Sequence, residues 1–352
     1  MTNKIAIGAA VLIGAIGIQS TLLWMAVYTH AAPYESEYFR VDEPAYHATP
    51  VKRLLTWADA QRSPVQADPI GRNSDLTRNR RMAEPLRLAG LTAFFALCGV
   101  LLGSYGGVAA FVIFLLMPPT FPYLVRLDSW MDSACLSLIA IGLISKHLLG
   151  RTGSSGADKS DRVKEVLIPA LAGACTAWAI DAKLTAALTL VPAAILIVRN
   201  ASCATVTGIL SGFLAGYVLA QPAWLLNPAS ALAHVTFWKS SNADQPAFDA
   251  LYPLTSLLAS IPWTIWILAG MGAAFGLRDQ AIRTAIILSG TPFVFFLLYR
   301  TFPPDGIRHF YLILPFLALI AGAEWAKLKV PWKFTAAASL AAELFFRTFP
   351  DF

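Results

Sequence analysis

Two adjacent carboxylates, Asp42 and Glu43, stand in the stretch YFRVDEPAYHATPVKRL, just after the first long apolar run of the chain. A carboxylate near a membrane surface can act as a general base that takes a proton from a hydroxyl or an amine. His47 lies in the same stretch, and an imidazole beside a carboxylate can also ligate a divalent metal ion. Pro44 disfavours helix at Glu43, so the acidic pair is expected on a turn. The stretch therefore offers general-base chemistry or, as the alternative, a metal site.

Further ionisable residues border apolar segments later in the chain. One such stretch, PPTFPYLVRLDSWMD, holds Arg126, Asp128 and Asp132. A second stretch, WAIDAKLTA, holds Asp181 and Lys183. The third stretch is YRTFPPDGIRHFYLILP, which holds Arg300, Asp305, Arg308, His309 and Tyr311. An arginine can clamp a phosphate with two hydrogen bonds and stabilise it as it leaves. If these groups meet at one membrane face, they suit chemistry on a lipid-borne phosphate. The alternative is interfacial charge that only anchors helix ends.

The composition identifies the kind of scaffold that must position these residues. The chain is 57% hydrophobic and only 14% charged, whereas ordinary globular proteins are about 25% charged. Because lipid forces each spanning segment to satisfy its own backbone, long apolar runs from end to end predict an all-α polytopic membrane protein. The alternating pattern of a membrane barrel is absent from the sequence. The net charge of +6 resides in loops and at helix ends, which favours topology and anionic lipid over nucleic acid as its cause.

Apolar runs of about 17–25 residues predict about eleven transmembrane helices. The predicted spans are residues 5–28, 88–104, 107–125, 128–149, 166–180, 184–198, 204–226, 251–276, 284–300, 309–325 and 334–346. The second and third spans, and the fifth and sixth, are predicted to form short hairpins. Residues 1–352 form one domain, with no separate soluble domain. The run 5–28 exceeds the apolar core of about 7–15 residues in a signal peptide, so it is expected to remain as the first span.

Residues 29–87 are predicted to form a large first extracytoplasmic loop. Within this loop, TPVKRLLTWADAQR has apolar residues at helical spacing. This predicts a short amphipathic helix, either on the membrane or against the protein's own outer face.

The four cysteines lie in or at the edge of apolar segments without metal-site spacing, and are expected to be packing residues.

The distribution of lysine and arginine sets the expected orientation. With Lys4 in the cytoplasm, the inner side collects Arg151, Lys159, Arg162, Lys164, Arg199, Arg278, Arg283, Lys327, Lys329 and Lys333. The short outer loops hold Arg126, Lys183, Lys239, Arg300 and Arg308. The first outer loop carries nine basic residues, which the rule tolerates because the loop approaches about 60 residues. This threading places all the chemistry-bearing groups on the outer face.

Four stretches, in chain order, resemble the GT-C membrane glycosyltransferases. VDEPAYH resembles the acidic motif of their first outer loop, and VRLDSWMDSACLSLIAIGL resembles the second outer motif, in which an aspartate opens the fourth span. LAGACTAWAIDAKLTAALTLVPAAILIV is similar to their fifth-to-sixth hairpin, and RHFYLILPFLALIAGAEW to their late helix. The branch that the sequence resembles most comprises dolichyl-phosphate-mannose–protein mannosyltransferases and bacterial aminoarabinose transferases. The resemblance covers most of the chain.

The resemblance implies an inverting glycosyltransferase, a hexosyl or pentosyl transferase whose donor is a polyprenyl- or dolichyl-phosphate sugar. Asp42 matches the catalytic base, and Glu43 would orient the acceptor. The acceptor or metal environment would comprise Asp128, Asp132 and His47. The donor phosphate would be bound by Arg308, Lys183, Arg126, Arg300 and Tyr311. The resemblance implies no certain cofactor, and a divalent metal ion is compatible with the acidic residues.

The implied partners are the lipid-linked donor, an acceptor protein, lipid or glycan, and membrane lipids, without nucleic acid. The expected location is the bacterial inner membrane, with the site facing the periplasm or cell exterior.

Pro44 replaces the alanine or glycine that the family often has. Many members continue with further spans or a soluble domain after the late motif, which leaves acceptor recognition open and allows a partner subunit.

Two other function classes remain open from the sequence. One is a transporter or flippase for a lipid-linked or anionic substrate, and the other is a non-catalytic membrane scaffold. Transporters bind substrate near the membrane midplane, often at broken helices. Because the span interiors here are nearly free of charge, the sequence favours surface chemistry on a lipid head group. It does not specify the sugar or the acceptor.

Overall fold

The computed structural model describes residues 69–118, 120, 129–150, 159–182, 184–198, 201–220, 252–298 and 311–348. Every regular element within these ranges is a helix, which confirms the predicted all-α class for the described part of the chain. The elements are α3 (Pro69–Leu116), α5 (Ser129–Gly150), α6 (Lys159–Ala182), η3 (Leu184–Ala186), α7 (Ala187–Val198), α8 (Cys203–Ala220), α11 (Tyr252–Ser260), α12 (Trp263–Phe275), α13 (Gln280–Leu298), α14 (Leu314–Lys327) and α15 (Val330–Thr348).

Helix α3 folds back on itself at Gly103. The φ of Gly103 is 73°, a backbone conformation that residues with a side chain rarely adopt. The ring of Phe94 lies 4.9 Å from that of Phe114, and the ring of Phe95 lies 5.1 Å from that of Phe111. These contacts join residues about twenty positions apart, so the two halves are antiparallel. Within described residues 88–116, the structure confirms the hairpin predicted from the spans 88–104 and 107–125.

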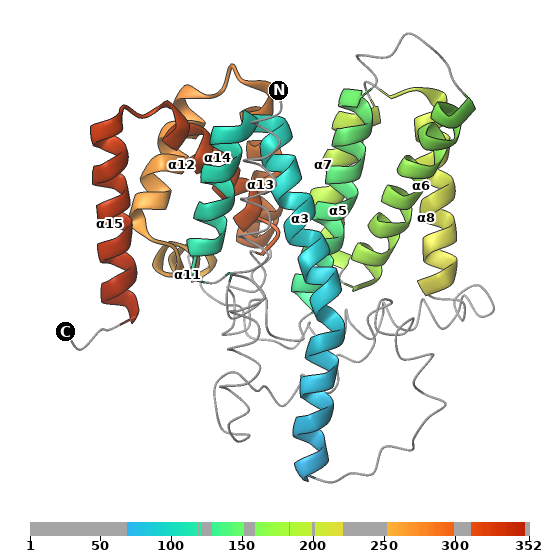
Figure 1. Cartoon of the computed structure of the whole chain (residues 1–352), viewed down its shortest axis with the longest axis horizontal. Helices are drawn as coiled ribbons and strands as arrows, with labels where there is room; N and C mark the ends of the chain where they lie inside the picture. Colours follow the sequence, from blue (N-terminus) through green and yellow to red (C-terminus); the bar gives the residue numbers. More distant parts are fainter. Residues whose placement is uncertain are drawn as a thin grey trace.

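The helices form a bundle in which α3 separates two groups (Figure 1). Helices α5, α6, α7 and α8 lie on one side, and α12, α13, α14 and α15 lie on the other. Helix α14 packs against α3, α12 and α13, and its residues from Leu314 to Glu324 are buried. An apolar helix without a polar face belongs in the interior of a bundle. Residues of α14 therefore form the centre of the core that includes Phe94, Met117, Ile265 and Ile282.

Helices α6 and α8 pack at very short range through small residues. Gly208, Gly212 and Gly216 are the buried positions that α8 turns toward α6. A Cβ added at Gly212 would lie 1.9 Å from the carbonyl oxygen of Ala170, so no larger residue fits without separating the helices. Small residues permit this close approach of two backbones, which increases the dispersion contacts between apolar helices.

One predicted span is extended and another is interrupted. Helix α3 begins at Pro69, inside the segment predicted as the first loop, and its apolar stretch Leu86–Gly103 lies within two residues of the predicted span 88–104. A proline in the first helical turn and oppositely charged residues such as Arg80 and Glu84, four positions apart, favour helix at residues 69–87. The span predicted at 251–276 is two helices, α11 and α12, because Pro262 lacks an amide proton and interrupts the helix.

Three helical segments in the described ranges are long and apolar enough to cross a membrane: Leu86–Gly103, Glu165–Ala182 and Cys203–Ala220. Tyr105–Leu116, Asp132–Ser145 and Trp263–Phe275 are apolar but shorter. These segments are compatible with a membrane protein. The predicted span 5–28 and the amphipathic stretch TPVKRLLTWADAQR lie outside the described residues.

Candidate active site

A buried ion pair joins α3 to the first turn of α5. The Nη2 atom of Arg87 donates to Oδ1 of Asp132 at 3.1 Å, and their side chains are 2% and 8% exposed. A buried charge is costly unless it is paired, because burial removes its hydration. The first turn of a helix also favours a carboxylate, since its amide groups carry partial positive charge. The pair therefore fixes the entry of α5 against α3.

A second hydrogen bond extends this junction to α6. The hydroxyl of Ser133 donates to the carbonyl oxygen of Ala179 at 2.9 Å, and Ser133 is fully buried. Ala179 lies in the last turn of α6, close to Asp181 in the sequence. The start of α5 thus contacts α3 through Asp132 and α6 through Ser133, at a single end of the bundle.

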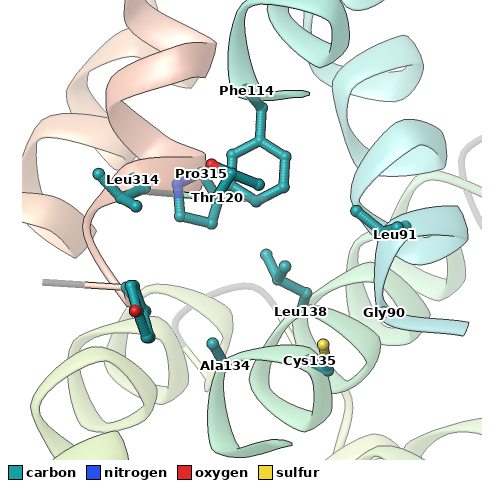
Figure 2. Close-up of a pocket in the computed structure, with 10 residues that line it drawn as sticks. Gly90, Leu91, Phe114, Thr120, Ala134, Cys135, Leu138, Leu314 and Pro315 are labelled. Atoms are coloured by element: carbon teal, nitrogen blue, oxygen red, sulfur yellow. The ribbon is translucent and has the colours of Figure 1, made fainter. Parts of the chain in front are cut away.

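A small apolar pocket lies one helical turn along α3 and α5 from the ion pair, and Figure 2 shows its lining. It is lined by Gly90, Leu91, Phe114, Thr120, Ala134, Cys135, Leu138, Tyr311, Leu314 and Pro315. Cys135 follows Asp132 by one helical turn, and Gly90 follows Arg87 in the same way, so the pocket is continuous with the junction. The hydroxyl of Thr120 is buried there with no hydrogen-bond partner among the described residues.

Of the predicted site residues, the structure describes Asp132 and Tyr311. Tyr311 is 2% exposed and precedes α14, and it shares the pocket with Cys135. The structure therefore brings the start of α5, the end of α6 and the start of α14 to one end of the bundle, together with Arg87. The other predicted site residues lie outside the described residues: Asp42, Glu43, His47, Arg126, Asp128, Lys183, Arg300 and Arg308.

Arg87 is a residue that the sequence reading missed as part of the site. It was counted among the basic residues of the first loop, whereas it is one of the largest fully buried side chains in the described structure. An arginine within an apolar helix is seldom buried without a carboxylate partner. That rule, applied to the start of the run LRLAGLTAFFALCG, could have signalled a partner, although not its identity.

A second polar cluster, here called the polar relay, lies at the opposite end of the bundle. The Nε2 atom of His147 lies 3.3 Å from the Thr205 hydroxyl, which lies 3.1 Å from the Ser202 hydroxyl. The Ser202 hydroxyl donates to Oε1 of Glu165 at 3.3 Å. These contacts join α5, α6 and the start of α8.

Counting protons gives the relay a direction. An ionised carboxylate can only accept, so the proton of Ser202 is directed toward Glu165. With that proton directed toward Glu165, the contact between Ser202 and Thr205 is a hydrogen bond when Thr205 donates, and the contact between Thr205 and His147 is one when Nε2 donates. This arrangement predicts a hydrogen on Nε2 of His147.

No three histidine, cysteine, aspartate or glutamate side chains come together as a metal site in the described part of the chain. The predicted alternative of a metal held by Asp42 and His47 concerns residues outside it.

Protein-family models, curated proteins and solved structures give no match to this chain.

Proposed function

We propose that the chain is an inverting membrane glycosyltransferase of the GT-C type. It would have about eleven spans and would move a sugar from a polyprenyl-phosphate donor to a hydroxyl or amine acceptor at the outer face. The observation that carries the proposal is the buried pair of Arg87 and Asp132 at 3.1 Å. It ties the segment that follows Asp42 in the chain to the helix that begins directly after Asp128.

The pair supports the proposal because it fixes the start of α5 against α3. Arg87 ends the segment 29–87 that carries the acidic pair, and Asp132 stands in the first turn of α5. Because Asp132 follows Asp128 by four residues, the pair holds the second acidic motif close to the start of the apolar part of α3. A general base must lie within hydrogen-bond reach of the proton it takes, so a fixed acceptor environment at Asp128 would serve catalysis.

The chemistry would use the chain's own residues as follows. Asp42 takes the proton of the acceptor as the acceptor's oxygen or nitrogen attacks the anomeric carbon of the sugar. The bond from that carbon to the phosphate oxygen breaks, and the electron pair leaves with the polyprenyl phosphate, inverting the configuration. Arg308 and Lys183, with Arg126, Arg300 and Tyr311, would stabilise the leaving phosphate. A divalent metal ion at Asp42 and His47 would add Lewis-acid stabilisation.

One observation bears on the transporter alternative, namely the break between α11 and α12. Discontinuous helices of transporters offer free amide groups to anionic substrates. Here the amides of Trp263 and Thr264 donate to the carboxylate of Glu343, at 2.5 and 3.0 Å. The start of α12 is therefore capped by the chain's own anion, which favours the enzyme over the transporter.

The deciding experiment measures sugar transfer by the purified full-length protein in lipid nanodiscs. The donor is a radiolabelled polyprenyl-phosphate sugar, offered with protein, lipid and glycan acceptors. Asp42→Asn is expected to lower transfer by roughly 10²–10⁴-fold, the usual contribution of a general base. Asp279→Asn is the matched control, because Asp279 is exposed at a turn between α12 and α13.

Equal transfer by the wild type and Asp42→Asn would refute the assignment of the base. Absence of donor binding would refute the enzyme and leave the transporter or scaffold. Movement of the lipid-linked sugar across a liposome membrane without transfer would then identify the transporter.

A further inference from the structure

The turns that follow α12 and α14 lie at one end of the bundle, opposite α11 (Figure 1). A Cβ at Gly272 would lie 2.7 Å from the carbonyl oxygen of Ile320, so the last turn of α12 packs against the middle of α14. The Nζ atom of Lys333 donates to the carbonyl oxygen of Ala326 at 3.2 Å, which holds the start of α15 against the end of α14. We call this surface the basic end, formed by residues 275–283 and 327–334.

The basic end carries more positive charge than its own carboxylates neutralise. Its basic residues are Arg278, Arg283, Lys327, Lys329 and Lys333. Lys327 pairs with Glu324 at 3.4 Å, and Lys333 lies 4.5 Å above the ring of Tyr105. Two of the five cations are therefore engaged within the protein.

The other three cations have no hydrogen-bond or ion-pair partner among the described residues. They are Arg278, Arg283 and Lys329, and all three are exposed. The carboxylate of Asp279 is the acidic group of these segments, and its Oδ1 accepts the amide of Ala281 at 2.8 Å. This carboxylate caps the start of α13, where it also meets the positive end of the helix dipole. Three exposed cations thus remain for an external anion.

Large apolar side chains surround these cations. Phe275, Trp332 and Phe334 are 75%, 61% and 72% exposed. Leu277 and Val330 are also exposed in the same two segments. Exposed aromatic residues of this size are unfavourable in water and favourable at the boundary between lipid head groups and acyl chains. The basic end therefore presents apolar and cationic groups together.

We propose that the basic end binds the phosphate groups of anionic phospholipids in the adjacent leaflet. The cations meet the phosphodiesters, and the exposed rings enter the layer beneath the head groups. An acidic soluble protein would match the charge but would leave Phe275, Trp332 and Phe334 to be covered by polar surface. Because the lipid matches both the charge and the apolar rings, it is the occupant that the surface fits. The proposal rests on the membrane location and is independent of sugar transfer.

The test compares binding of phosphatidylglycerol and phosphatidylcholine to the full-length protein by native mass spectrometry. Near an anionic membrane surface each basic residue contributes about fivefold in affinity. The triple variant Arg278→Gln, Arg283→Gln and Lys329→Gln should therefore bind phosphatidylglycerol on the order of 100-fold more weakly. Binding of phosphatidylcholine should not change. Raising the salt to about 0.5 M should weaken phosphatidylglycerol binding by the wild type, because salt screens exposed charge.

The matched control removes the same charge from the part of α3 that precedes Arg87. Arg72→Gln, Arg78→Gln and Arg80→Gln together should leave phosphatidylglycerol binding within about twofold of the wild type. Equal loss in both triple variants would show a response to net charge alone and would overturn the proposal. So would equal binding of the two lipids by the wild type.

Three further outcomes separate this proposal from its alternatives. If the basic-end variant loses binding of polyglutamate but keeps that of phosphatidylglycerol, the surface recognises acidic protein and the proposal is wrong. If the wild type leaves cell membranes on carbonate extraction, the membrane location itself is wrong. If the wild type transfers sugar but binds the two lipids equally, this proposal is overturned and the proposed enzyme is unaffected.

Discussion

The ion pair of Arg87 and Asp132 gives the sharpest test of the packing at the proposed site. We predict that Arg87→Met and Asp132→Leu each destabilise the protein strongly, whereas the double variant is close to the wild type. Arg87 is 2% exposed, and its Nη2 atom lies 3.1 Å from Oδ1 of Asp132. Removing one partner leaves the other charge buried without compensation, which costs about 3–5 kcal/mol. Replacing both with apolar residues of similar size is often neutral or stabilising.

The free energy of unfolding is measured in mixed micelles, by recording the helix content of the protein as the fraction of denaturing detergent is increased. A coupling energy of several kcal/mol is expected from the double-mutant cycle, with the double variant restored relative to both single variants. Arg283→Gln serves as the control, because Arg283 is exposed, and its effect should stay within about 0.5 kcal/mol.

Two results would refute the reasoning. Additive losses in the double variant would show that the two side chains do not interact. Single variants as stable as the wild type would show that the pair is hydrated, not buried. Sugar transfer by the double variant adds a separate reading, since a stable protein with reduced transfer would show that the pair also positions the acidic motifs.

Three other predictions concern elements away from the pair. Gly212→Val should lower the unfolding free energy by about 1–3 kcal/mol or more, because the larger side chain overpacks against α6. Gly270→Ala, whose added Cβ meets open space, should be nearly neutral. Equal losses of unfolding free energy in the two variants would refute the close contact of α6 and α8. Glu343→Ala should cost about 0.5–2 kcal/mol by removing the cap of α12, measured in the same unfolding assay, and an unchanged midpoint would show that the cap does not form in solution. Nitrogen-15 NMR of labelled histidine should show the hydrogen of His147 on Nε2, because the predicted direction of the relay has Nε2 donating to Thr205. His147→Gln identifies the signal. A neutral ring with its hydrogen on Nδ1 alone would contradict that direction.

Much of the helical framework follows from local sequence alone. Apolar run length predicts the helices observed as α5, α7 and α14 within a few residues, because every backbone polar group in such a run is satisfied inside its own helix. Two successive apolar runs predict a turn at residues 105–106, whereas the turn lies at Gly103, where glycine adopts a φ of 73°. Pro262 was a local signal for the break before α12 that the apolar run obscured.

The sequence by itself therefore determined that the chain is helical, apolar and suited to a membrane, and that its ionisable residues stand at the ends of apolar runs. The tertiary structure decided which of those residues meet. Asp132 is 45 residues from Arg87, and Glu343 is 79 residues from Thr264, whose amide donates a hydrogen bond to its carboxylate. Such contacts depend on how each helix is rotated and seated against its neighbours. That seating is set by small-residue contacts such as Gly212 against Ala170, because close-packed backbones leave few alternative registers.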